Sequence, residues 1–309
     1  MIVTVTLNPS LDEWVYLPRL RLGELNRAER AVRYPGGKGL NVSRVVHELG
    51  GKTLAVALAG GPDGRILAEL LRQQRIPYRF IDVPGSTRNN YHIHTTRPRA
   101  LTQINTPGPR VSRRVFTTIE RLVGRLSAGA ACVVLSGSLP PGLPMSTYQR
   151  LMARDCRPLT VLDTSGPALR AGLAAAPWLI KPNRQEAEEL LGHALGRLAD
   201  VARAARALTR RGPRLVLISL GAGGAVLASQ AHAAVLWAAP PAVPVDSAVG
   251  AGDSLVAGFV LGWRRTHSLR EALRLGVACG AACAMTPGTE LCHRSDVLRL
   301  KGRVTLRTL

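Results

Sequence analysis

A glycine-rich turn that ends in an acid could carry phosphoryl-transfer chemistry in this chain. In SAVGAGDSLVAGF (247–259), Gly250, Ala251 and Gly252 precede Asp253. Small residues let successive backbone N–H groups face open space, and a following helix adds the positive end of its dipole. Asp253 would stand where a carboxylate can take a proton from an attacking hydroxyl. By itself, the pattern also fits an ordinary helix N-terminus with an acid in its first turn.

A second glycine cluster, YPGGKGLNVSR (34–44), could also present backbone amides to an anion, and it contains a lysine as well. Lys38 offers a point charge for an anion, and Asn41 can form hydrogen bonds to hydroxyl groups. The segment is not a Walker A loop, because Gly39 follows the lysine and the four-residue spacer between the glycines is missing. The dinucleotide pattern GxGxxG does not follow the first strand either. The chemistry suggested is therefore anion binding without the common nucleotide motifs.

Alternating strand and helix signals surround these two clusters. Apolar runs such as IVTVT (2–6), TLAVALAG (53–60) and RLVLISLG (214–221) alternate with helical periodicity, and long helices are expected from near 251 and 268. This alternation predicts an α/β fold with a mostly parallel sheet and helices on both faces, whose ligands bind at the carboxyl ends of the strands. Six such ends are polar or glycine-rich: TLNPSLD, VLSGSLPPG, LDTSG, IKPN, ISLGAGG and VDSAVGAGD.

Residues 78–105 break this rhythm with short alternating segments separated by turn residues. Together with the extended segment 11–34, they predict a small antiparallel β-sheet lid on a single domain that spans 1–309. His92 and His94 alternate on one lid strand. Such a pair can suggest a metal site, but we expect a solvated strand face.

The net charge of +21 comes mostly from arginine, since Lys38, Lys52, Lys181 and Lys301 are the only lysines. This charge suits anionic partners, either nucleic acid or small phosphorylated metabolites. The arginines alternate with apolar residues at helical spacing, which is typical of solvated helix faces, and 4% aromatic residues is little for base stacking. Composition therefore favours a small anionic partner over nucleic acid.

The cysteines predict free, mostly buried thiols in a reducing compartment, because their number is odd and no CxxC spacing occurs. Three of them with His293 could be imagined as a metal set, but an alanine-rich helix interior explains the first two of that set. The sequence begins directly with a strand and lacks any run long enough to span a bilayer, so we expect a cytoplasmic protein. The five cysteines are Cys132, Cys156, Cys279, Cys283 and Cys292.

Five motifs together resemble one family over nearly the whole chain. They are GGKGLNVSR, GSLP at 137–140, KPN with a glutamate three residues on, SLGAGG and VGAGDS. In order and spacing they are similar to the ribokinase or PfkB sugar kinases, in the branch that phosphorylates sugar phosphates. TLNPSLD, STRNNYHIH and PGTELC resemble the minor bacterial 6-phosphofructokinase, whereas GGKGLN and LTQINTPGP fit 1-phosphofructokinases and tagatose-6-phosphate kinases equally well. The resemblance implies a ribokinase-like fold and the use of ATP and Mg²⁺.

The resemblance also implies a role for each residue that matches a motif. Asp253 would be the catalytic base, and Gly250, Ala251 and Gly252 would form the anion hole. Sugar hydroxyls would be bound by Asp12, Gly37 and Asn41, and the substrate's existing phosphate by Lys38, Arg88, Ser138 and, from the lid, Arg27. The ATP site would comprise Lys181 at the phosphates, Asn183 and Glu186 at Mg²⁺ through water, and Ser219, Gly221, Gly224 and Ser247 along the nucleotide.

These roles predict transfer of the ATP γ-phosphoryl group to a hydroxyl of a ketohexose phosphate, with fructose 6-phosphate as the favoured acceptor. The alternatives are a 1-phosphofructokinase, a tagatose-6-phosphate kinase, a ribose or nucleoside kinase, or a nucleic-acid-associated protein on a kinase-like fold. Asn183 could instead simply cap a helix, with Glu186 completing the capping pattern. An exposed edge of the lid could also pair with a second copy of the chain, which would make a homodimer.

Overall fold

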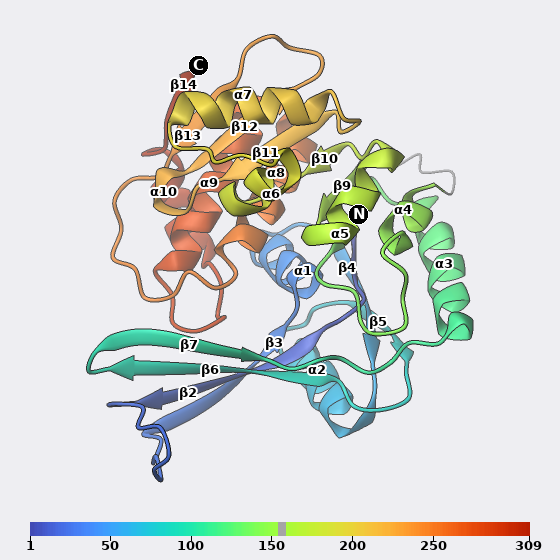
Figure 1. The fold of residues 1–309 in the computed structure, drawn as a ribbon, viewed down its shortest axis with the longest axis vertical. Coiled ribbons are helices and arrows are strands. Elements are labelled where there is room, and N and C mark those ends of the chain that lie inside the picture. Colours follow the sequence, from blue (N-terminus) through green and yellow to red (C-terminus); the bar gives the residue numbers. More distant parts are fainter. Residues whose placement is uncertain (154–158) are drawn as a thin grey trace.

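The computed structural model describes residues 1–153 and 159–309, which form two sheets flanked by helices (Figure 1). The larger sheet has ten strands in the order β14-β13-β12-β11-β10-β9-β8-β1-β4-β5. From β5 to β11 neighbouring strands are parallel, whereas β12, β13 and β14 each pair antiparallel. The strands are β1 (Ile2–Thr6), β4 (Thr53–Ala59), β5 (Tyr78–Asp82), β8 (Cys132–Ser136), β9 (Leu159–Asp163), β10 (Leu179–Ile180), β11 (Leu215–Ser219), β12 (Ala225–Ser229), β13 (Leu236–Ala239) and β14 (Thr305–Thr308).

Helices cover both faces of this sheet, which confirms the expected α/β architecture. Strand side chains alternate between the two faces, so Ile2 belongs to one buried cluster while Val3 and Val5 belong to another. One face carries α1 (Lys38–Glu48), α2 (Gly61–Gln73), α8 (Ala251–Thr266), α9 (Leu269–Ala284) and α10 (Arg294–Lys301). The other carries α3 (Arg113–Ser127), α4 (Thr147–Met152), α5 (Gly166–Gly172), α6 (Arg184–Leu191) and α7 (Leu198–Thr209), and the turns η1 (Leu173–Ala175) and η2 (Gly221–Gly223) complete the fold.

Close packing of α8 on α9 fixes the helix that carries Asp253. A Cβ atom added to Gly258 would lie 2.6 Å from Cys279 Sγ, and one added to Gly276 would lie 2.8 Å from Leu255 O. Only glycine allows such an approach of two helix backbones. The position of the N-terminus of α8 is therefore set by the packing of its glycine-bearing face.

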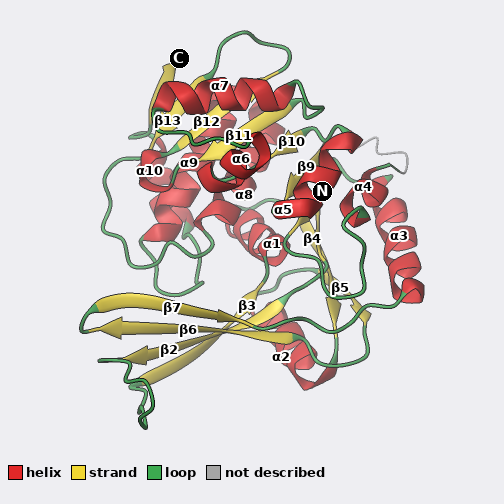
Figure 2. Ribbon diagram, viewed as in Figure 1, coloured by secondary structure: helices red, strands yellow, loops and turns green. Residues whose placement is uncertain are grey.

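The lid is a four-stranded sheet, in the order β3-β2-β6-β7, which extends away from the main body (Figure 2). Its central strands β2 (Ser10–Leu17) and β6 (Arg88–Thr96) are parallel, and β3 (Arg30–Gly36) and β7 (Arg99–Asn105) pair antiparallel at the edges. Residues 78–82, expected in the lid, instead form β5 beside β4 in the large sheet. The reason is that Tyr78 and Phe80 pack against the buried cluster under α2.

The expected free thiols are confirmed for Cys132, Cys279, Cys283 and Cys292, which are unpaired and buried. Cys156 and the end of the helix expected near 146–155 lie outside the described residues. Among residues 1–153 and 159–309, no helix combines the length and apolar character needed to cross a bilayer. In the same ranges, no group of three or more His, Cys, Asp or Glu side chains is placed to hold a metal ion.

Candidate active site

A cleft of about 1150 Å³ lies between the carboxyl ends of the large sheet and the inner face of the lid. Its floor is formed by the loops after the central strands and by the first turns of α1 and α8. The strands β2, β6 and β7 form its other wall. It brings together most of the site residues expected from the sequence: Asp12, Gly37, Lys38, Asn41, Arg88, Ser138, Lys181, Asn183, Ser219, Gly221, Gly224, Gly250, Ala251, Gly252 and Asp253.

Asp253 is the third residue of α8, and its side chain faces the cleft floor, where the residue is 7% exposed. Asn41 Nδ2, from α1, donates a hydrogen bond of 2.9 Å to Asp253 Oδ2. Burial raises the pKa of Asp253 to about 6, an increase that Lys38 and Asn41 oppose and Asp163 reinforces. A carboxylate with such a pKa is ionised at neutral pH and still able to take up a proton, as a general base requires.

Asp163, at the end of β9, joins two lysines that the sequence places far apart. Its fully buried Oδ1 lies 3.1 Å from Lys38 Nζ and 3.3 Å from Lys181 Nζ. Burial alone would raise the pKa of Asp163, but the two ammonium groups outweigh it and lower the pKa overall. Burial disfavours the charge on Lys38, yet Asp163 and Asp253 raise its pKa. Asp163 therefore holds two cations at the floor of the cleft.

The turn before α8 presents backbone amides to the same space. Gly250 is left-handed (φ 84°), and a Cβ on it would lie 2.5 Å from Leu291 Cδ2, so this bend requires glycine. A Cβ on Gly252 would lie 3.6 Å from Lys181 Nζ, which places this residue beside the cation. The Ala251 amide already donates to Ala248 O, so the two glycine amides are better placed than Ala251 for a ligand.

The lid side of the cleft contains a hydrogen-bonded acid and an arginine. Asp12 Oδ1 accepts hydrogen bonds from Ser10 Oγ (2.9 Å) and Asn90 Nδ2 (3.2 Å), which orient the carboxylate. Arg88 is half-buried, its guanidinium donates to Asn8 O and Thr106 O, and burial lowers its pKa. Because backbone carbonyls hold it, the Arg88 side chain is fixed over the cleft as a cation.

The chain matches the family model described as "pfkB family carbohydrate kinase" over residues 5–296. It belongs to the pfkB family of carbohydrate kinases. Accordingly it is a sugar-phosphate kinase, which uses ATP and transfers phosphate to a hydroxyl group.

Relatives of this pfkB family kinase include an ATP-dependent 6-phosphofructokinase isozyme 2 of Mycobacterium tuberculosis, 40% identical over 96% of this chain and 88% of the relative. A 1-phosphofructokinase of Bacillus subtilis is 37% identical over 94% of this chain and 95% of the relative. Among solved structures, phosphofructokinase-2 of Escherichia coli in complex with potassium superposes with a TM-score of 0.92 at 34% identity, with 98% of each chain covered. The expected ribokinase-like fold is thereby confirmed.

Three residues expected in the site of this pfkB family kinase do not line the cleft. Arg27 is exposed in the loop between β2 and β3. Ser247 is buried, and its Oγ accepts a hydrogen bond from Val249 N, so it shapes the turn before α8. Glu186 faces a neighbouring depression of about 690 Å³.

Asn183 and Glu186 form a capping box at the start of α6. This confirms the alternative in which Asn183 caps the helix and Glu186 completes the capping pattern. Asn183 Oδ1 accepts from the Glu186 amide and Glu186 Oε2 accepts from the Asn183 amide, both at 2.8 Å. Each side chain therefore has one oxygen committed to the helix terminus. Asn183 nevertheless lines the cleft.

Sequence reasoning missed Asp163 and several polar residues of the cleft. LDTSG was recognised as a polar strand end, and its acid could have been singled out because it follows a fully buried run. The expectation that His92 lies on a solvated strand face is wrong, because the residue is 3% exposed and stacks on Trp14. The period-two alternation of NNYHIH places Asn90 and His92 on one face of the strand, and this pattern could have indicated that they line the same surface. The further polar lining residues are Asn8, Ser10, Asn90, Gln103, Asn105, Thr164 and Ser165.

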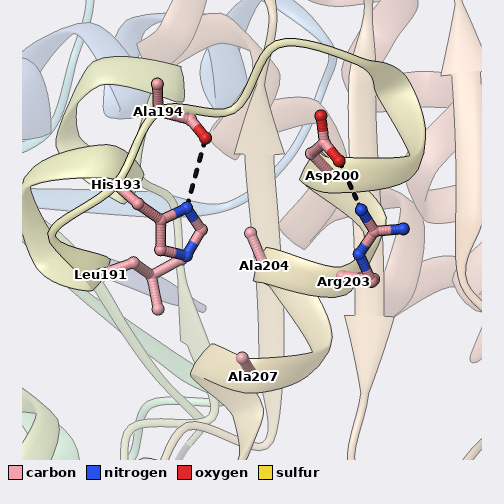
Figure 3. A pocket seen from close by; sticks show the side chains of 7 residues that line it. All are labelled: Leu191, His193, Ala194, Asp200, Arg203, Ala204 and Ala207. Atoms are coloured by element: carbon pink, nitrogen blue, oxygen red, sulfur yellow. Dashed lines mark hydrogen bonds and ion pairs between the residues drawn. The ribbon is translucent and has the colours of Figure 1, made fainter.

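A smaller depression of about 300 Å³, at α7 and the end of α6, shares no residue with the cleft (Figure 3). Its polar side chains are satisfied locally. Arg203 Nη2 contacts Asp200 Oδ1, and His193 Nδ1 lies 3.2 Å from Ala194 O. The chemistry of this pfkB family kinase is therefore assigned to the larger cleft.

Proposed function

We propose that this kinase phosphorylates a ketohexose phosphate, with fructose 6-phosphate favoured and fructose 1,6-bisphosphate as the product. The observation that carries the proposal is one cleft in which a buried, pKa-raised Asp253 shares the space with the fixed cation Arg88. A base and a separate cationic group suit an acceptor that already bears a phosphate. A ribose or nucleoside acceptor would leave Arg88 without an anion to bind.

In this reaction, Asp253 accepts the proton of a primary sugar hydroxyl while the hydroxyl oxygen forms a bond to the γ-phosphorus of ATP. The bond from that phosphorus to the bridging oxygen breaks, and ADP leaves with the electron pair. Lys181 and the Gly250 and Gly252 amides neutralise charge on the transferred group. The lid wall limits the access of water, which could otherwise accept the phosphoryl group.

The substrate's own phosphate is assigned to Arg88, Ser138 and Lys38. Ser138 Oγ lies 3.0 Å from Asn8 Nδ2, and the carbonyl of Asn8 holds the Arg88 guanidinium, so Asn8 links the serine to the arginine. Such a pair can bind a phosphate group by charge and by hydroxyl donation. Fructose 6-phosphate and fructose 1-phosphate carry the phosphate at opposite ends of similar rings, so a 1-phosphofructokinase is the alternative, with tagatose-6-phosphate kinase as a third possibility.

The nucleotide is assigned to the end of the cleft lined by Ser219, Gly221 and Gly224, with Val243 and Val277 as apolar surface. Glu186 fits a water-mediated Mg²⁺ site from just outside the cleft, because the capping box engages only its Oε2 and Mg²⁺ keeps several of its waters. The single side-chain oxygen of Asn183, which lines the cleft, accepts from the Glu186 amide and keeps a second lone pair for such a water. When bound, Mg²⁺ supplies positive charge that neutralises the phosphates of ATP.

One experiment tests the substrate assignment. ATP consumption is measured with fructose 6-phosphate, fructose 1-phosphate, tagatose 6-phosphate, ribose and adenosine as acceptors. We expect the highest kcat/KM with fructose 6-phosphate, in line with the names of the M. tuberculosis and E. coli relatives. A preference for fructose 1-phosphate would make the protein a 1-phosphofructokinase, the function for which the B. subtilis relative is named. Turnover of ribose or adenosine alone would overturn the proposal. Nucleic-acid binding without turnover of any acceptor would favour the nucleic-acid-associated alternative.

We further propose a homodimer that forms through the lid. The edge strand β7 is exposed along its whole length, and Tyr91 and Ile104, paired in register on the outer face, are exposed large side chains. Such an edge is a template for pairing with a second chain. The E. coli relative has been solved as a "tetrameric inhibited form". Size-exclusion chromatography with light scattering should give a mass of two chains, and Ile104→Lys should shift it to one; a monomeric wild type would reject the dimer.

A further inference from the structure

We propose that His92 determines substrate specificity by donating a hydrogen bond from Nε2 to the same sugar hydroxyl that donates to Asp12. This inference rests on the proposed function and deepens it, because it names the feature of the ketohexose phosphate that the lid recognises. Together the imidazole donor and the carboxylate acceptor would recognise a hydroxyl group in one configuration at a ring carbon.

The His92 ring is held rigidly in the cleft wall. Parallel pairing of β2 and β6 sets Trp14 opposite His92 and Asp12 opposite Asn90. The ring stacks on Trp14 with centroids 4.6 Å apart and planes 7° apart. Trp14 is itself 1% exposed, and its Nε1 donates to Thr289 Oγ1 at 3.1 Å. The imidazole plane is therefore fixed from below by a buried indole that is tied to the main body of the protein.

Gln103 on β7 contacts the other nitrogen of the His92 ring. Gln103 Nε2 lies 3.4 Å from His92 Nδ1. An amide N–H that donates to Nδ1 requires a lone pair there, which leaves the ring proton on Nε2. Within the described residues, His92 Nε2 has no hydrogen-bond partner. The cleft thus contains an oriented and unused donor.

The spacing between His92 and Asp12 lets one oxygen atom, placed beside the line that joins Nε2 to Oδ1, lie within hydrogen-bond distance of both. Nε2 lies 3.8 Å from Asp12 Oδ1, which is too long for a direct hydrogen bond. Oδ1 already accepts from Ser10 Oγ and Asn90 Nδ2, and these two hydrogen bonds orient the carboxylate. A sugar hydroxyl is both donor and acceptor, and it can bond the carboxylate and the imidazole at once. An epimer with this hydroxyl inverted would leave the buried imidazole donor unsatisfied and would remove one hydrogen bond from the carboxylate.

The test uses His92→Phe, which keeps an aromatic ring on Trp14 but removes the donor. We expect KM for fructose 6-phosphate to rise about tenfold with KM for ATP within about twofold, because a buried hydrogen bond from the imidazole to the sugar is lost. The decisive readout is the ratio of kcat/KM for fructose 6-phosphate to that for its C4 epimer, tagatose 6-phosphate. This ratio should fall at least about fivefold. His94→Phe is the matched control, since His94 lies on the same strand face but does not line the cleft.

The outcomes separate the two proposals. A wild type that phosphorylates neither sugar phosphate rejects the proposed function. A wild type that discriminates between the epimers, with His92→Phe discriminating equally well, rejects only the role of His92. Equal loss in the His94 variant also rejects it, since the effect would then belong to the lid sheet as a whole. If His92→Phe unfolds, Gln103→Leu replaces it: this change frees Nδ1 without touching the stack, and an unchanged epimer ratio would overturn the inference.

Discussion

The floor and the lid of the cleft are built from different kinds of side chain. In the floor, Asp253, Lys38 and Lys181 line the cleft, and the fully buried Asp163 lies beneath them and pairs with both lysines. Apart from Asp12 and Arg88, the lid wall is formed by hydrogen-bonding side chains such as those of Asn90, His92 and Gln103. The floor is therefore suited to moving charge, and the lid to recognising hydroxyl groups.

The difference has an energetic cause. Charges buried in the floor lose hydration, which is tolerable only because each is held by a partner of opposite charge or by a hydrogen bond. This mutual dependence shifts pKa values and makes the floor intolerant of substitution. The lid is attached to the main body by few polar contacts, among them Trp14 to Thr289 and Arg99 Nη2 to Val245 O at 2.7 Å. We therefore expect floor substitutions to lower kcat and lid substitutions to raise KM.

The largest expected effect is that of Asp253→Asn on turnover. The amide keeps the shape and the contact with Asn41 but cannot accept the proton, so kcat should fall by about 10²–10⁴-fold with both KM values little changed. Wild-type kcat/KM should fall about tenfold per pH unit below about 6, as Asp253 becomes protonated. The matched control is Asp296→Asn, since Asp296 is also the third residue of its helix but is not part of the cleft. Normal turnover of Asp253→Asn would remove the base assignment.

Asp163→Asn should disturb the whole floor. It leaves two lysines beside a neutral amide in a buried setting, which costs about 3–5 kcal/mol when one partner of a buried ion pair is lost. We expect kcat to fall, both KM values to rise and the melting temperature to fall by several degrees, as thermal unfolding with steady-state kinetics would show. Glu120→Gln separates the two effects, because the buried Glu120 forms an ion pair with the exposed Arg150 outside the cleft. It should lose stability but keep both KM values; equal kinetic losses in the two variants would contradict the special role of the floor.

The same contrast explains what the sequence could predict. Floor residues in glycine-rich turns, such as Lys38 and Asp253, follow buried strands or begin helices, and local pattern is enough to find them. Asp163 escaped notice because its importance comes from two lysines that are remote in sequence. The lid was harder to delimit: β5 alternates like a lid strand, and only its packing under α2 assigns it to the large sheet. His92 looked solvated because a two-residue alternation does not reveal what covers the strand face.

Arg88→Ala tests the lid side of the contrast. Loss of the guanidinium should raise KM for the sugar phosphate by about 10–100-fold, since a charge-assisted contact to a phosphate is removed, while KM for ATP changes by less than about twofold. Arg125→Ala, an exposed arginine on α3, should change neither value. A comparable rise in KM for ATP would place Arg88 in the nucleotide end of the cleft and contradict its assignment to the acceptor.

Asp253→Asn should also change how stability depends on pH. The pKa of Asp253 is raised from 3.8 to about 6 in the folded state, so its ionisation opposes folding at neutral pH. The variant should therefore be more stable than the wild type at pH 7–8, by on the order of 2 kcal/mol. As the pH falls through about 6 the wild type becomes protonated when folded, and the advantage should vanish below about pH 4. Urea unfolding at several pH values measures this; a pH-independent difference would show that Asp253 is not strained by burial.

The smallest effect is expected when the lid is loosened and the cleft itself is left intact. Thr289→Val removes the acceptor of the Trp14 N–H bond with little change in volume, and one hydrogen bond contributes about 1 kcal/mol. If this bond holds the lid wall in place, KM for the sugar phosphate should rise by no more than about fivefold while kcat stays the same. Thr266→Val removes a hydroxyl that bonds Gly262 O and the Ser268 amide, neither of which lines the cleft, and should leave KM unaltered. If Thr289→Val instead lowers kcat and leaves KM unchanged, the lid acts on the chemical step. Recognition would then not belong to the lid and chemistry to the floor.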